Sequence, residues 1–232
     1  VAKGLNLARN LLMDINNIGL PAGTEFLDMV TGQYISDLIS WGAIGARTTE
    51  SQVHRELASG LSASIGFKNA TNGDIQVAVD AVKAATYSHH FLSTTKAGAT
   101  AIYETKGNEN CHIILRGGAS GPNFEKSFVD DCIAKLQKAG SDSKVMIDCS
   151  HGNSKKDYKN QKPVLANICE QISTSNDVFG VMIESNLVAG NQDINKQPLE
   201  YGKSVTDACV DFDETIEMLQ MLSDAVKARR NK

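Results

Sequence analysis

The feature that most constrains this chain is a regular alternation of short β-rich runs with longer segments of helical period. Because helical crossovers join parallel strands, the alternation predicts an α/β fold with a parallel sheet, in one continuous domain over residues 1–232. At one helix start, Thr49 and Gln52 have capping-box spacing. The predicted strands are residues 25–30, 42–46, 64–67, 91–94, 145–148 and 179–183.

Two architectures accommodate such repeats, an open doubly wound sheet and a (β/α)₈ barrel. The Gly-x-Gly-x-x-Gly fingerprint of dinucleotide-binding sheets is absent, because the segment from Gly42 to Ala46 lacks its spacing. We therefore predict a TIM (β/α)₈ barrel. A barrel needs eight units and about 250 residues. The alternation in these 232 residues provides six strand–helix units, so about two units are missing.

One segment departs from the alternation. Residues 99–103 and 111–115 are both strand-like, and Gly107-Asn-Glu-Asn110 separates them. This pattern predicts an inserted β-hairpin over residues 99–115. Because an insertion lies outside the repeating unit, we expect it to be regulatory or to serve oligomerisation, and not to be catalytic.

Composition narrows the function classes. The formal net charge is −4, which argues against a generally basic nucleic-acid-binding surface. No apolar run approaches the roughly 18 residues of a membrane span. The five cysteines are dispersed without a CxxC pair, so neither a disulfide framework nor a zinc knuckle is indicated and a reducing cytoplasm is expected.

Three cations follow predicted strands in this acidic chain, namely Arg47, Lys68 and Arg116. Each alone is equally well explained as a surface charge or as a partner for Glu25 or Asp28. In a barrel, however, reactive residues lie at the carboxyl ends of the strands. Guanidinium and ammonium groups gathered there bind phosphate and carboxylate. The set therefore predicts an anionic, phosphorylated substrate.

A second set, His151, Glu184 and Asp207, also follows apolar runs or lies in a late loop. Imidazole with two carboxylates favours Mn, Fe, Co or Zn over the all-oxygen sites of Ca and Mg. Spacing alone leaves chance placement open, because such residues are common at strand ends. Cys149 is either a thiolate ligand beside His151 or a small buried hydrophobic residue, and we favour the second interpretation.

Six segments carry a resemblance to a known family: Gly45-Ala-Arg-Thr-Thr-Glu-Ser-Gln-Val-His-Arg-Glu-Leu-Ala-Ser-Gly60, Gly66-Phe-Lys-Asn69, His112-Ile-Ile-Leu-Arg-Gly-Gly118, Ile147-Asp-Cys-Ser-His-Gly-Asn-Ser154, Val181-Met-Ile-Glu-Ser185 and Ser204-Val-Thr-Asp-Ala-Cys209. They resemble the type I 3-deoxy-D-arabino-heptulosonate 7-phosphate (DAHP) synthases of bacteria and fungi. The resemblance extends over essentially the whole chain, and the run that begins at Gly45 is its most specific part.

The resemblance implies a transferase that condenses phosphoenolpyruvate with erythrose 4-phosphate and releases phosphate, at the entry to the shikimate pathway of aromatic amino acid synthesis. It further implies that Arg47, Lys68 and Arg116 hold the phosphate and carboxylate of phosphoenolpyruvate. The resemblance also implies that Glu25 and Ala46 line the same pocket.

The same resemblance implies that His151, Glu184 and Asp207 are three of four ligands of a divalent metal ion, Mn, Fe, Co or Zn, with Lys68, His151 and Asp207 catalytic. The ion would act as a Lewis acid on the aldehyde oxygen while the enol carbon attacks. The family's fourth ligand, a cysteine in Gly-Pro-Cys-Ser, and its Lys-Pro-Arg-Thr segment do not occur in this sequence. We expect both upstream of Val1, so the chain represents the last six barrel units and its activity alone is an open question.

The hairpin resembles the allosteric insertion of feedback-sensitive members, beside which an aromatic amino acid binds. This implies an effector site formed by Gln33, Ser62, Phe91, Ser93 and Tyr103. Ser93 leaves less room than glycine for a para-hydroxyl group, which favours phenylalanine over tyrosine. We also expect a homo-oligomer, a dimer or a tetramer, with no nucleic-acid or membrane partner.

Two alternatives differ from this interpretation. One is a related synthase that uses arabinose 5-phosphate and makes 3-deoxy-octulosonate 8-phosphate; the Gly45 motif and the hairpin argue against it. The other is a non-catalytic amino-acid-binding or oligomerisation module. Retention of the three cations and the three candidate ligands argues against that loss of function.

Overall fold

The computed structural model describes residues 1–142 and 144–231. Their contacts divide them into two compact units, which are described separately below. The first comprises Val1–Ala70, Ile75–Ile113 and residues 138–142, and the second comprises Thr71–Asp74, Ile114–Gln137 and residues 144–231. The main sheet has six strands in the order β1-β2-β3-β6-β7-β8. This half-barrel sheet agrees with a partial TIM barrel.

The first unit begins with helix α1 (Ala2–Asn17), followed by β1 (Gly23–Glu25), the short helices α2 (Gly32–Ile35) and η1 (Ser36–Leu38), β2 (Trp41–Ile44), α3 (Gln52–Ser59), β3 (Ser64–Lys68) and α4 (Gln76–Ala85). Strands β1, β2 and β3 pair in parallel, with Glu25 opposite Ala43 and Ile44 opposite Phe67. Strand β3 is buried at every position after Ser64 because it lies inside the sheet with both faces covered. This arrangement places the residues that follow β1, β2 and β3 at the same edge.

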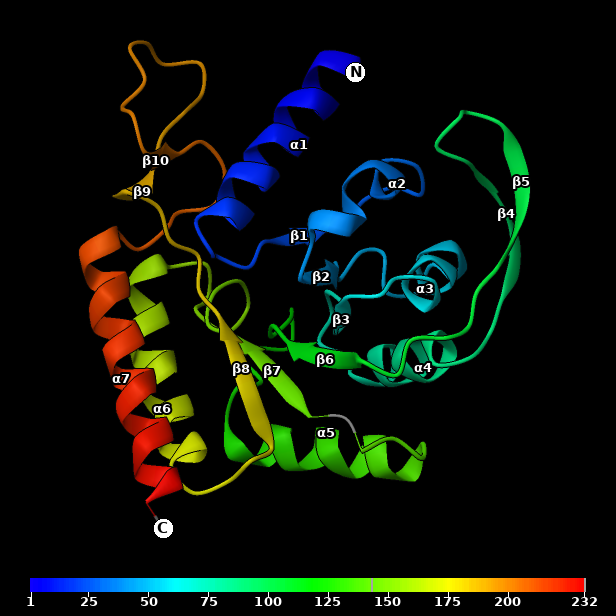
Figure 1. Ribbon diagram of the computed structural model, residues 1–232. Helices are drawn as coiled ribbons and strands as arrows, with labels where there is room; N and C mark the ends of the chain where they lie inside the picture. The colour runs from blue at the N-terminus through cyan, green and yellow to red at the C-terminus, as the bar shows by residue number, and fades with distance from the viewer. Residues whose placement is uncertain (143, 232) are drawn as a thin grey trace. The chain divides into compact units, whose positions relative to one another are not determined.

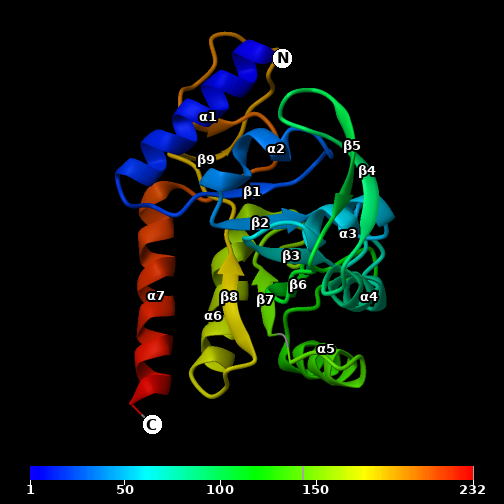
Figure 2. The ribbon, with the colours of Figure 1, turned by 45° about the vertical axis from the view of Figure 1, so that its right-hand side comes forward.

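The prediction of a hairpin over residues 99–115 is wrong in its pairing. The antiparallel hairpin joins β4 (His90–Thr94) to β5 (Thr100–Glu104), and β6 (Cys111–Leu115) is a strand of the main sheet. Figures 1 and 2 both show β4 and β5 side by side along their length. The physical reason lies in the burial pattern. Every residue of β6 is buried, whereas exposure alternates along β5, as it does in a two-stranded ribbon.

The connection after β5 returns the chain to the sheet and is not a hairpin turn. Gly107 adopts a φ of +87°, and a Cβ there would lie 2.1 Å from the carbonyl oxygen of Thr86, so only glycine fits. The buried Asn108 side chain then donates to the carbonyl oxygens of Ala58 and Ala63, at 3.1 and 3.0 Å. These bonds anchor the base of the hairpin to the end of α3 and to the approach to β3.

The second unit contains most of α5 (Lys126–Lys138), followed by β7 (Val145–Asp148), η2 (Tyr158–Asn160), α6 (Gln161–Ile172), β8 (Val178–Met182), the small β9 (Val188–Asn191) and β10 (Lys203–Ser204), and α7 (Phe212–Arg230). Strands β7 and β8 pair in parallel. Helices α6 and α7 lie side by side (Figure 1). The Asp211 side chain caps α7 by accepting from the Glu214 amide at 2.8 Å.

Four of the six predicted sheet strands correspond to observed ones, with shifts at their ends, and the prediction of 25–30 is wrong over most of its length because it shares only Glu25 with β1. The predicted strand 91–94 overlaps the hairpin strand β4, while β6 takes its place in the sheet. Within the described residues, no helix combines the length and apolar character needed to cross a membrane. A single domain over residues 1–232 stays a prediction.

Candidate functional site

In the second unit, the structure brings His151, Glu184 and Asp207 together. One ligand atom of each lies within 4.8 Å of the others. His151 follows β7, Glu184 follows β8, and Asp207 lies in the loop after β10. His151 and Glu184 are partly buried and Asp207 is exposed. The spacing left these residues unconnected, and the fold places them in one cluster.

The imidazole of His151 is oriented by a buried carboxylate. Its Nδ1 atom lies 2.8 Å from Oδ2 of Asp148, whose side chain has no solvent exposure. Its Nε2 atom lies 3.3 Å from Oε1 of Glu184. His151 itself has a φ of +51°, an uncommon conformation for a residue with a side chain. A carboxylate on one ring nitrogen with the other nitrogen directed into a carboxylate cluster is the arrangement typical of metal-binding histidines.

The donor set fits a divalent transition metal. One imidazole nitrogen and two carboxylates suit Mn, Fe, Co or Zn. Within the described residues, Nδ1 of His151 is the one buried side-chain polar atom without a well-aligned hydrogen bond, although it lies beside Asp148. The thiol of Cys149 is a poor candidate ligand, because it is fully buried and burial raises its pKa. The interpretation of Cys149 as a small buried hydrophobic residue agrees with this environment.

Arg116 lies at the end of β6, and the loop after it interlocks with the loop that carries His151. The amide of Asn153 donates to the carbonyl oxygen of Arg116 at 3.2 Å. The buried Asn153 side chain donates to the carbonyl oxygens of Leu115 and Asp148, at 3.1 and 2.8 Å, and so joins the ends of β6 and β7. Gly117 has a φ of +68°, and a Cβ there would lie 2.5 Å from the backbone of Gly152. The close approach of the backbones at Gly117 and Gly152 therefore places Arg116 beside the loop that carries His151.

The predicted substrate residues of the first unit lie at the carboxyl ends of β1, β2 and β3. Glu25 ends β1, Ala46 and Arg47 follow β2, and Lys68 ends β3. Lys68 is buried, whereas Arg47 and Glu25 are exposed. A Cβ at Gly45 would lie 2.2 Å from Oε1 of Glu25, so glycine leaves room for this carboxylate.

Thr49 connects two of these strand ends. Its buried hydroxyl group lies 3.0 Å from the carbonyl oxygen of Gly45 and 2.7 Å from that of Lys68. The prediction that Thr49 begins the following helix is wrong, because Ser51 occupies the N-cap position. Since the hydroxyl group is directed at the neighbouring strand, Thr49 fixes the ends of β2 and β3 relative to each other. Sequence spacing alone did not reveal this role.

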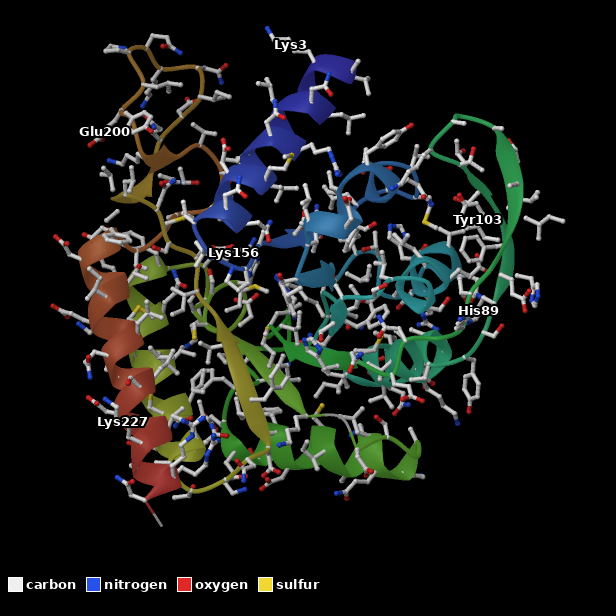
Figure 3. All side chains as sticks on the ribbon, viewed as in Figure 1. Lys3, His89, Tyr103, Lys156, Glu200 and Lys227 are labelled. Atoms are coloured by element: carbon white, nitrogen blue, oxygen red, sulfur yellow. The ribbon has the colours of Figure 1, made fainter. Side chains whose placement is uncertain are left out.

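A cavity of the first unit lies beside the hairpin and has a volume of about 630 Å³. Gln33, Ser62, Phe91, Ser93 and Tyr103, the five residues predicted to bind an effector, all line it. Phe91 and Tyr103 are opposite each other in the hairpin, and their rings stack with centroids 6.1 Å apart. In Figure 3, Tyr103 lies on the side of the hairpin toward α3.

A buried polar network closes the base of this cavity. The hydroxyl groups of Ser59 and Thr105 lie 2.7 Å apart, and Thr105 Oγ1 also accepts from the amide of His89 at 2.9 Å. Ser59, Thr105 and Asn108 all contribute to the cavity lining. These three were not predicted as site residues; their only sequence signal is that they are polar residues beside buried strands.

Comparisons with known proteins agree with these features. A sequence model of the DAHP synthetase I family matches residues 2–220. A phospho-2-dehydro-3-deoxyheptonate aldolase of Haemophilus influenzae is 57% identical over 229 residues, which are 98% of this chain and 63% of that protein. A Phe-sensitive form from Escherichia coli K12 is also 57% identical, over 98% of this chain and 65% of that protein. The chain thus spans less than two thirds of the length of these relatives.

A solved structure agrees with the fold in detail. The phospho-2-dehydro-3-deoxyheptonate aldolase of Francisella tularensis SCHU S4 superposes with a TM-score of 0.97 and is 76% identical in sequence. The similarity covers 98% of this chain and 67% of that chain.

Proposed function

Because the chain belongs to the DAHP synthetase I family, we propose that it takes part in the condensation of phosphoenolpyruvate with erythrose 4-phosphate, with release of phosphate. The observation that carries this proposal is the cluster of His151, Glu184 and Asp207, whose ligand atoms lie within 4.8 Å of one another. Arg47, Lys68 and Arg116, which follow or end strands, supply positive charge for two phosphorylated substrates. The activity is that of a transferase in aromatic amino acid synthesis.

In this proposal Arg47, Lys68 and Arg116 bind the phosphate and carboxylate of phosphoenolpyruvate, with Glu25 and Ala46 in the same pocket. Arginine binds such groups with two parallel hydrogen bonds, and an ammonium group contributes a compact charge. Lys68 is buried, so its charge acts on the substrate with little screening by water. These cations offset the charge that grows on the departing phosphate.

His151, Glu184 and Asp207 would hold a divalent ion of the Mn, Fe, Co or Zn class. When bound, such an ion supplies Lewis-acid polarisation of an aldehyde oxygen. The Asp148 carboxylate lies 2.8 Å from Nδ1 of His151, and Nε2 lies 3.3 Å from Oε1 of Glu184 in the cluster. Ser150 donates to Oε2 of Glu184 at 2.7 Å and leaves Oε1 directed toward His151. Lys68, His151 and Asp207 are the catalytic residues of this proposal.

The cavity beside the hairpin is the proposed feedback site for an aromatic amino acid. Its size and the stacked pair Phe91 and Tyr103 suit an aromatic side chain. Relatives are named Phe-sensitive, Trp-sensitive and tyrosine-inhibited, so their names do not select the effector. We propose phenylalanine, because Ser93, which lines the cavity, leaves less room than glycine for a para-hydroxyl group. We further propose a cytoplasmic homo-oligomer, a dimer or a tetramer.

The test is consumption of phosphoenolpyruvate by the full chain in the presence of erythrose 4-phosphate, with and without a chelator. We expect consumption that a chelator abolishes and that added Mn²⁺ restores. Activity unaffected by the chelator would overturn the metal assignment. Activity with arabinose 5-phosphate alone would favour the related synthase, and binding of phenylalanine without any turnover would favour a non-catalytic module.

A further inference from the structure

Gln161, the first residue of α6, is a fully buried polar residue outside the predicted site. Its carboxamide pairs with both backbone groups of Glu184. The Nε2 atom donates to the Glu184 carbonyl oxygen at 3.0 Å, and Oε1 accepts from the Glu184 amide at 2.9 Å. Because an amide nitrogen only donates and a carbonyl oxygen only accepts, the two bonds together define the orientation of the carboxamide.

This pairing occurs where the sheet no longer holds the chain. Strand β8 ends at Met182, two residues before Glu184. A carboxamide presents one donor and one acceptor side by side, like the edge of a neighbouring strand. The side chain of Gln161 therefore replaces the strand partner that Glu184 lacks on that side. The Val210 amide adds one further bond to the Glu184 carbonyl oxygen, at 3.0 Å.

The carboxylate of Glu184 is held separately. Ser150 Oγ donates to Oε2 at 2.7 Å, and Oε1 lies 3.3 Å from Nε2 of His151. With the backbone fixed at one end and Oε2 at the other, little rotational freedom remains for Oε1. A ligand held in this way loses little entropy when it binds a metal ion.

We propose that Gln161 is a positioning residue, which sets the place of the Glu184 carboxylate through the Glu184 backbone and so raises the affinity of the cluster for a divalent cation. This inference rests on the proposed function of the cluster. Gln161 itself touches neither substrate nor metal. Its contribution is to hold a backbone segment beyond the end of β8 in a single arrangement.

The test is titration of the full chain with Mn²⁺. Binding is measured by calorimetry and by the electron spin resonance signal of free Mn²⁺. Gln161→Met keeps the length of the side chain and removes both hydrogen-bonding groups. We expect affinity to fall by about 10–100-fold, the usual effect of losing an outer-shell partner. The matched control is Gln171→Met in the same helix, which removes the 2.8 Å bond to the Phe124 carbonyl oxygen and leaves Glu184 untouched. Its Mn²⁺ affinity should stay unchanged.

A second measurement separates positioning from general stability. Hydrogen exchange of the Glu184 amide should be slow in the wild type and faster in Gln161→Asn, whose shorter amide does not reach. Thermal melting identifies variants that remain folded at the temperature of the titration. A folded Gln161 variant that binds Mn²⁺ as the wild type does would overturn the inference, as would fast exchange of the Glu184 amide in the wild type. A wild-type chain with a slowly exchanging amide but no Mn²⁺ affinity would overturn the metal assignment instead.

Discussion

The candidate metal cluster and the hairpin cavity are built in opposite ways. Around His151 and Glu184, fully buried polar side chains hold the candidate ligands from behind, as Asp148 and Gln161 do. The hairpin is a two-stranded ribbon whose outer face exposes Leu92 and Ile102, at 72% and 75%. A ribbon of two strands is marginally stable by itself and depends on its base. The candidate metal cluster is therefore supported by buried side chains, whereas the proposed effector site lies on an element that ligand binding can stabilise.

Removal of one candidate metal ligand should weaken metal binding strongly and change the stability of the fold little. Asp207 is exposed, so Asp207→Asn should change the free energy of unfolding by less than about 0.5 kcal/mol. Mn²⁺ affinity should fall by more than the roughly 100-fold upper range for outer-shell losses. Titration with Mn²⁺ and urea unfolding measure the two effects. Unchanged affinity would contradict the assignment of Asp207.

Acidification should weaken the first unit through His112 in β6. Trp41 Nε1 donates to His112 Nε2 at 3.1 Å, so that nitrogen is unprotonated, and burial lowers the pKa of His112 to about 4. The unfolded chain takes up this proton near pH 6.5. Stability from His112 is therefore complete above pH 6.5 and is lost as the pH falls toward 4.

Between pH 7 and pH 5 the expected loss is about 2 kcal/mol. Urea unfolding followed by the fluorescence of Trp41, the single tryptophan, measures it. The control is His112→Gln, which should flatten the pH dependence over this interval. A wild-type free energy of unfolding that is constant from pH 7 to pH 5 would exclude a buried neutral His112.

A smaller change should separate the two regions. Asn108→Ala removes the bonds to the carbonyl oxygens of Ala58 and Ala63 at the base of the hairpin. Leaving buried carbonyl groups unpaired costs about 1–3 kcal/mol. We expect weaker phenylalanine binding by calorimetry with unchanged Mn²⁺ affinity. Equal loss of both affinities would show that the hairpin and the cluster are one cooperative structure.

The last prediction concerns which aromatic amino acid the cavity prefers, and its expected effect is small. Ser93→Gly should improve inhibition by tyrosine relative to phenylalanine by about tenfold, because removal of one small group from a pocket changes binding by roughly 1–3 kcal/mol. Inhibition assays with each amino acid measure the ratio, and Ser88→Gly, outside the hairpin strands and the cavity lining, is the control. Equal sensitivity of the wild type to both amino acids would contradict the role of Ser93.

How far sequence reasoning succeeded depended on the kind of signal. The resemblance to a known family identified the candidate ligands and the five cavity residues, and the structure brings each of these sets together. The hairpin was mispaired because residues 91–94 and 111–115 are both short β-rich runs. The two runs differ in burial, since Cys111–Leu115 is buried throughout and no residue of His90–Thr94 is buried.

Residue order and periodicity were enough to identify the family, the parallel α/β class and the chemical types of the candidate site residues. Which polar residues support them depends on the folded chain. Asp148, Thr49 and Gln161 are ordinary polar residues in the sequence, and their roles come from being buried beside a strand end. A buried polar group needs a hydrogen-bond partner, and the fold determines which partner lies within hydrogen-bonding distance.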